Sequence, residues 1–225
     1  ICMIIEKVKL ENFRNYTSCE LELSPGLNIF RGNNAQGKTN FLESVYISSI
    51  GKSPKTNKEK DLIKWGSNFA KVYVKSKKKY YDQTIELVLN DQTNKIIKIN
   101  GMGIKRIGDL IGEMPVVYFA PDEIGLIKDG PADRRRFMDI DISQLNKQYF
   151  YNLLRYDKIL NERNKLKKKK KTLEGISDTI DLWDSQLADV ASRIIFQRLW
   201  FLDKIKEPAK KIHHNLTSGN EDLDV

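Results

Sequence analysis

The sequence has few residues that could form disulfides, and it has no long hydrophobic run. Two of its 225 residues are cysteines, Cys2 and Cys19. One pair provides no disulfide framework, which excludes a small disulfide-rich extracellular fold. No apolar run reaches the roughly 18 residues that a membrane-spanning helix needs, and Glu6 places a charge too early for a secretory signal. We therefore expect a reducing, cytoplasmic setting and no membrane.

Positive charge is concentrated in one segment. The net charge is +9, and the run from Arg163 to Lys171 supplies seven basic residues and no acid. Such a run suits a polyanionic partner such as DNA, and it is equally typical of a solvated helix end. Both interpretations stay open. The candidate DNA contacts are Lys167, Lys168, Lys169, Lys170 and Lys171.

The hydrophobic pattern changes character after Ile142. Before it, short alternating segments predict strands, and the apolar runs 27–30 and 116–119 predict two buried strands. After it, apolar residues recur at helical spacing in two long segments, and the second series is broken only near Arg198. Pro208 is expected to end or interrupt the second helix. The lysine run lies between the two segments, so we predict an antiparallel helical arm with lysines near its tip.

The segment from Gly32 to Thr39 reads G-x-x-x-x-G-K-T, between an apolar run and a helical pattern that starts at Lys38. The glycines let backbone amides approach a phosphate, and the helix start directs free N–H groups at the same anion. Lys38 is expected to reach the β- and γ-phosphates of ATP, and the Thr39 hydroxyl to bind Mg²⁺. The predicted nucleotide-binding residues are Gly32, Asn33, Asn34, Ala35, Gln36, Gly37, Lys38, Thr39 and Asn40. The alternative, a glycine turn followed by an incidental Lys-Thr pair, does not account for the flanking patterns.

Motifs on either side of this loop resemble the SMC-like ABC ATPases and, among them, the RecF family of bacterial recombination-repair proteins. They are ENFRNY at 11–16, the loop itself, FAPDEIGLIKDGP at 119–131, RRRFMD at 134–139 and WDSQLA at 183–188. The resemblance implies an α/β fold: a P-loop ABC-type ATPase lobe with a mixed sheet plus an inserted antiparallel helical lobe. Residues 3–142 would form the ATPase lobe and 143–215 the helical lobe. Residues 216–225 would begin a return to the ATPase lobe.

The resemblance also implies a function. It is ATP-dependent DNA binding in the repair of single-strand gaps, with an ATP-driven homodimer, slow ATP hydrolysis, and RecR as a partner in RecA loading. A small nucleotide or metabolite kinase is the alternative, although it would need an arginine-bearing lid where this chain has a lysine-bearing helical arm. A DNA-binding module without enzymatic activity is a third possibility.

Further site residues follow from the resemblance alone. Arg14, with Asn15 beside it, would reach the nucleotide phosphates, unless it is a surface turn residue. Ile63 would pack on the base, or belong to the core. Asp122 and Glu123 stand where ABC ATPases have the Q-loop glutamine, and capping a helix is the other interpretation. A signature turn and a convincing Walker B acid are not found in this sequence, so we expect these 225 residues to be essentially inactive as an ATPase.

Overall fold

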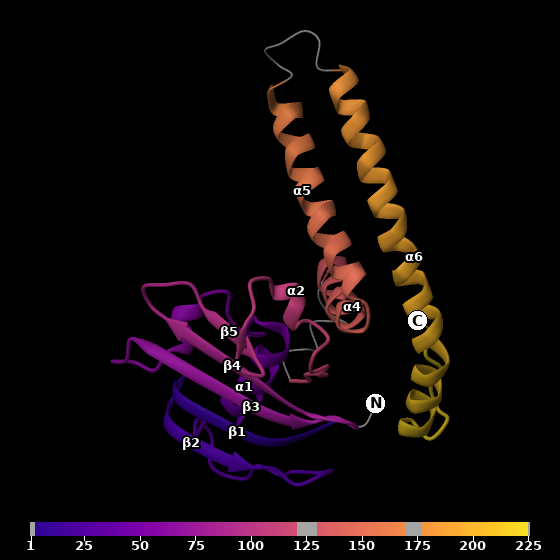
Figure 1. Ribbon diagram of the computed structural model, residues 1–225. Helices are drawn as coiled ribbons and strands as arrows, with labels where there is room; N and C mark the ends of the chain where they lie inside the picture. The colour runs from indigo at the N-terminus through magenta and orange to yellow at the C-terminus, as the bar shows by residue number, and fades with distance from the viewer. Residues whose placement is uncertain (1–2, 121–129, 170–176, 225) are drawn as a thin grey trace. The chain divides into compact units, whose positions relative to one another are not determined.

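The computed structural model describes residues 3–120, 130–169 and 177–224. They belong to two compact units, Ile1–Pro121 and Asp122–Val225, and each unit is described by itself (Figure 1). Within the described ranges, no helix combines the length and apolar character that crossing a bilayer requires.

The first unit is built on one six-stranded sheet. Its strands are β1 (Ile4–Phe13), β2 (Tyr16–Glu22), β3 (Phe69–Lys77), β4 (Asp82–Asn90), β5 (Ile96–Ile99) and β6 (Met102–Gly103). Their order is β2-β1-β3-β4-β5-β6, and every neighbouring pair is antiparallel. The unit also contains α1 (Lys38–Ile50), a short 3₁₀ turn η1 (Glu59–Leu62) and α2 (Ile107–Leu110).

Alternation along the strands separates the two faces of this sheet. Val8, Val72 and Leu87 point to one face, where they form a buried cluster with Phe41 and Ile47 of α1. The residues between them carry charges that pair across the opposite face, as Lys9 does with Glu20 and Lys71 with Glu86. Burial of the apolar face against α1 therefore fixes the register, because a slip by one residue would bring the lysines into the core.

The α/β fold class is confirmed, but the two apolar runs expected as buried strands are not strands. Residues 27–30 and 116–119 form no β-ladder, so the sheet that the structure describes is antiparallel and the parallel part of the expected mixed sheet is not seen in it. Leu27 and Val117 are 84% and 83% exposed. One side of each run does pack, since Phe30 contacts Phe41 and Tyr118 contacts Tyr46. Their composition suits a strand, but a strand also needs hydrogen-bonding neighbours, which the sequence pattern does not supply.

The second unit consists of α4 (Pro131–Leu145), α5 (Lys147–Lys169) and α6 (Ser177–Leu216). Helices α5 and α6 run antiparallel, as predicted (Figure 1). The expected boundary after Ile142 falls inside α4, because Ile142 is buried in the core of this helical unit. Pro208 does not end α6, which continues to Leu216. A proline removes one donor to the preceding turn, and the turns on either side keep α6 intact.

A partly buried polar network joins the three helices. Arg198 Nη2 of α6 donates to both carboxylate oxygens of Asp139 of α4, at 2.8 and 2.9 Å. Tyr149 of α5, which has no exposed surface, donates its hydroxyl to Asp139 and accepts from Arg198 Nε at 3.0 Å. Arg198, which breaks the apolar pattern, is thus part of the helix interface.

Asp141 of α4 makes the stability of this unit depend on pH. Burial raises the pKa of its carboxyl from 3.8 to about 6, so the folded state favours the neutral acid. The stability that the neutral Asp141 carboxyl gives the folded unit is fully present below pH 4 and is lost as the pH rises through 6. We expect Asp141→Asn to raise stability at pH 7 by about 1 kcal/mol, a small gain because water screens a group that is only partly buried, and to leave stability at pH 4 unchanged. Urea unfolding at both pH values measures this, with exposed Asp157→Asn as the control, and an equal gain at pH 4 contradicts it.

Candidate nucleotide-binding site

The predicted phosphate-binding loop from Gly32 to Thr39 is called the P-loop below. Close packing between the P-loop and the turn that joins β1 to β2 shapes the site. Gly37 precedes α1 with a φ of 102°, a conformation that favours glycine. A methyl group at Gly37 would lie 2.7 Å from Asn15 Oδ1 and 3.0 Å from the Tyr16 ring. The Tyr16 hydroxyl donates to the Gly37 carbonyl at 3.1 Å, and Asn40 Nδ2 donates to Asn15 Oδ1 at 2.9 Å. The backbone conformation therefore favours glycine at the second glycine position of the motif, and a Cβ there would have to displace the Asn15 side chain.

Positive groups gather at the start of α1. The Lys38 ammonium curls over the loop and donates to the carbonyls of Gly32 and Asn33 at 2.7 and 2.6 Å. No side chain caps the helix start, and its first turn has no acid, so the amide groups there are available to an anion. Thr39 is exposed, with its hydroxyl in the first turn. These donors fit the phosphates of a nucleotide, and the hydroxyl fits a bound cation.

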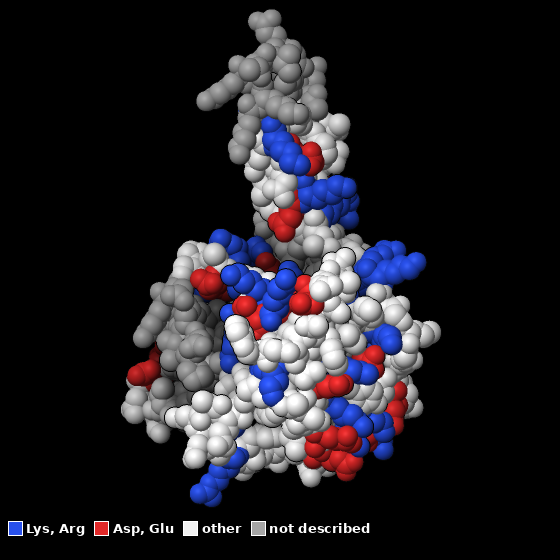
Figure 2. Space-filling model, turned by 90° about the vertical axis from the view of Figure 1, so that its left-hand side faces the viewer, with Lys and Arg blue, Asp and Glu red and all other residues white. Residues whose placement is uncertain are grey.

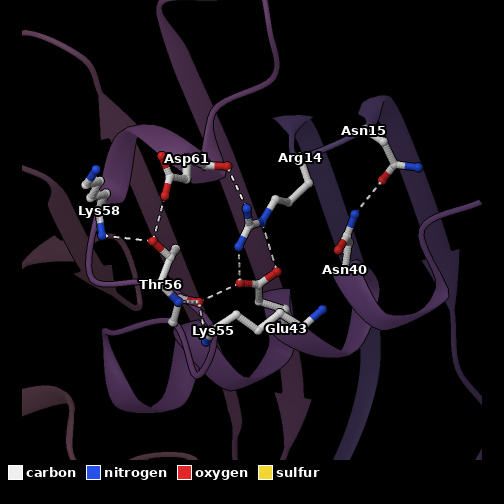
Figure 3. Close-up of polar contacts among 9 residues, drawn as sticks. Arg14, Asn15, Asn40, Glu43, Lys55, Thr56, Lys58 and Asp61 are labelled. Carbon is white, nitrogen blue, oxygen red and sulfur yellow. Dashed lines mark hydrogen bonds and ion pairs between the residues drawn. The ribbon is translucent and has the colours of Figure 1, made fainter. Parts of the chain in front are cut away.

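Arg14 is held by groups other than the P-loop. Its Nε and Nη2 donate to the two carboxylate oxygens of Glu43 of α1 at 3.0 and 2.7 Å, and its Nη1 donates to the Asp61 carbonyl at 2.9 Å (Figure 3). Glu43 has no exposed surface and also accepts from Ser53 Oγ at 2.5 Å. A phosphate contact of Arg14 stays a prediction, and the surface-turn alternative does not fit a guanidinium held at three points.

Sequence reasoning missed Glu43. Glutamate is rarely buried unless it is paired, so a helical glutamate is ordinarily taken as solvent-facing. A signal was present, since Glu43, Ile47 and Ile50 follow each other at steps of four and three and share one face of α1. Both isoleucines are buried, so the position of Glu43 on this face was readable from the spacing.

The remaining predicted residues divide into three groups. Ile63 packs against the sheet core and forms a β-bridge with Phe13, which agrees with its core alternative. Its contact with a base stays a prediction. Residues 32–36 are exposed, and so is Lys167. Asp122, Glu123, Lys170, Lys171 and the side chains of Lys168 and Lys169 lie outside what the structure describes.

One hollow on the first unit lies away from the start of α1. It has a volume of about 1130 Å³ and covers the charged face of the sheet around β1, β2 and β3. Its lysines are already paired, as Lys7 is with Glu22 and Lys75 with Asp82. The hollow therefore offers an anion little uncompensated positive charge, unlike the start of α1.

The comparisons with known proteins point the same way. A family model described as an AAA domain matches residues 7–223. The chain is 44% identical to the DNA replication and repair protein RecF of Clostridium tetani and 46% identical to that of Clostridium botulinum, over 98% of this chain and 60% of each relative. A solved structure of the recombination mediator protein RecF with ATP superposes with a TM-score of 0.91, at 36% identity, over 99% of this chain and 59% of that one. An Smc head domain from Pyrococcus furiosus, with a TM-score of 0.52 and 18% identity, shares the fold alone.

Fold and site together define a P-loop ATPase lobe of the ABC type with an antiparallel helical lobe. The chain belongs to the AAA domain family, and the resemblance to RecF predicted from its motifs is confirmed. The chain spans about 60% of the length of the RecF relatives that it matches.

The close contact at Gly37 gives a direct test of this geometry. Gly37→Ala would force its Cβ against the Asn15 amide and displace the loop, so we expect at least a tenfold loss of ATP affinity with about 1–2 kcal/mol of destabilisation. Gly101→Ala is the matched control, because Gly101 has a φ of 79° with nothing within 4 Å of the added carbon. Calorimetric titration with ATP and urea unfolding measure both effects. Equal affinities in the two variants would contradict the role of the contact.

Proposed function

We propose that this chain binds ATP with Mg²⁺ at the loop 32–39 and serves as the nucleotide-binding part of an ATP-dependent DNA-binding protein of recombinational repair. The observation that carries the proposal is the uncapped start of α1 with Lys38 over a loop fixed at Gly37. The likeness to a RecF structure with ATP over 99% of this chain supports it. The similarity to RecF proteins does not favour the kinase alternative.

Each residue has a distinct task in this proposal. The amide groups of Lys38 and Thr39 bind phosphate oxygens without a change in helix structure, because nothing caps them. The Lys38 ammonium exchanges its two carbonyl partners for the β- and γ-phosphates. The Thr39 hydroxyl holds Mg²⁺, which neutralises phosphate charge when bound. Helices α4, α5 and α6 act as the helical lobe of the same chain.

The activity of the whole protein extends this proposal. An ATP-dependent homodimer would close on DNA at single-strand gaps in the cytoplasm, with RecR as a partner in RecA loading and slow ATP hydrolysis as the release step. The relatives are named for DNA replication and repair, which supports this assignment. The first unit, which carries the loop 32–39, would supply the nucleotide contact.

Removing the Lys38 charge tests the nucleotide site. We expect Lys38→Ala to lower ATP affinity by about 10- to 100-fold, because hydrogen bonds to charged groups contribute about 1.5–3 kcal/mol. Isothermal titration with ATP and Mg²⁺ measures this, and circular dichroism checks the fold. Lys77→Ala is the control, since Lys77 is an exposed lysine at the far end of β3. Unchanged affinity in folded Lys38→Ala would refute the site.

The lysine run gives a test of DNA binding. Basic side chains lie on the described part of the helical unit next to the undescribed segment (Figure 2). We expect replacement of Lys167, Lys168, Lys169, Lys170 and Lys171 by glutamine to weaken DNA binding at low salt and to flatten its salt dependence, because up to about five phosphates would no longer be neutralised. The control replaces Lys204, Lys210 and Lys211 at the other end of α6. A salt slope equal to that of the wild-type chain would make the run a solvated helix end.

A further inference from the structure

Glu43 combines complete burial with three hydrogen bonds to its carboxylate. It has no exposed surface, and Arg14 Nε, Arg14 Nη2 and Ser53 Oγ all donate to its carboxylate. Removing a carboxylate from water costs several kcal/mol of free energy unless the carboxylate is paired in this way. Glu43 lies one helical turn after Thr39, on the helix that begins at the P-loop. Its charge thus connects the nucleotide-binding helix to the guanidinium of Arg14.

Arg14 is fixed at both ends. Its backbone has a φ of 53°, a left-handed conformation that costs a non-glycine residue energy, and its amide donates to the Leu62 carbonyl at 2.8 Å. Its guanidinium has five N–H groups, of which three bind Glu43 and the Asp61 carbonyl. Two N–H groups remain, and 20% of the side chain is exposed. The guanidinium therefore has one orientation and two spare donors.

The position of Arg14 in the chain indicates that the ligand of its two remaining N–H groups is an anion. The next residue, Asn15, lies against Gly37 and binds Asn40 of α1. The turn that carries Arg14 is thus packed onto the P-loop, because Asn15 follows Arg14 directly in the chain. Planar guanidinium groups match phosphate oxygens well.

We propose that Glu43 is the positioning residue for Arg14: its buried carboxylate orients the guanidinium so that the two remaining N–H groups bind phosphate oxygens of a nucleotide at the P-loop. This inference rests on the proposed function, since it requires a nucleotide there. Glu43 itself does not touch the nucleotide. It acts through Arg14, and the segment between α1 and β3 contributes through Ser53 and the Asp61 carbonyl of η1.

A purely structural ion pair makes a different prediction. If Glu43 only holds the fold together, Glu43→Gln lowers stability and leaves the ATP affinity of the folded chain unchanged. If it positions Arg14, Glu43→Gln weakens ATP binding even in fully folded protein. The loss of ATP affinity that Glu43→Gln causes should also disappear in a chain that already carries Arg14→Lys. A lysine has no planar guanidinium to orient, and coupled residues give non-additive effects.

The experiment is a double-mutant cycle on the whole chain with Glu43→Gln, Arg14→Lys and both together. ATP affinity is measured by calorimetry and stability by urea unfolding. We expect each single variant to bind ATP about tenfold more weakly than the wild-type chain, and the double variant to bind no more weakly than either. Ser53→Ala is the matched control, because it removes one donor to Glu43 and keeps the paired contact with Arg14, so its ATP affinity should change less than about threefold.

Several outcomes would overturn the inference. Additive losses in the double variant would show that Glu43 acts independently of Arg14. Wild-type ATP affinity in folded Glu43→Gln would leave it a structural role alone. Arg14→Lys keeps a positive charge beside Glu43. Wild-type ATP affinity in Arg14→Lys would therefore overturn the inference even if Glu43→Gln failed to fold. If the wild-type chain binds no ATP, the proposed function itself fails, and this inference fails with it.

Discussion

A carboxylate without any contact to water must find its partners as the chain folds, and Glu43 imposes this requirement on the first unit. Burying an unpaired charge costs several kcal/mol, so a fold in which Arg14 is absent from this place is strongly disfavoured. The partners come from two separate segments: Arg14 follows β1, and Ser53 follows α1. Arg14 in turn holds the Asp61 carbonyl. One buried charge thus brings together the P-loop helix, the turn after β1 and the loop that leads to β3.

The contact at Gly37 adds a second constraint on the same helix. The Asn15 side chain and the Tyr16 ring occupy the space that a Cβ at Gly37 would need, and the Tyr16 hydroxyl holds the Gly37 carbonyl. The backbone of the loop is therefore fixed by the β1–β2 turn on one side and by α1 on the other. A loop shaped before its ligand arrives loses little conformational entropy on binding. The two constraints share the segment 14–16, so a displacement of that turn would disturb both the loop and the ion pair.

What could be predicted from the sequence was local. Helix α1 begins at Lys38, where the motif and its apolar spacing place it, because glycine before the helix and an apolar face along it act over a few residues. The runs 27–30 and 116–119 have strand composition, yet pairing depends on segments far away in the chain, which no local pattern encodes. Arg14 and Glu43 are 29 residues apart, and a single sequence gives no sign that they meet. The P-loop was thus predictable as a motif, whereas the ion pair beside it was not.

The helical unit also contains an ion pair between segments far apart in the sequence, and it shows which sequence signal could reveal such a pair. Arg198 interrupts the apolar series of α6, and the structure places it against Asp139 and the buried Tyr149. A shift of α6 by one residue would rotate Arg198 by about 100° around the helix axis, leaving Asp139 and the Tyr149 hydroxyl without their partner. Apolar contacts alone tolerate such shifts more easily, because one methyl group resembles another. A charged residue within an apolar stripe therefore selects one helix register, and the same argument applies to Glu43 among the isoleucines of α1.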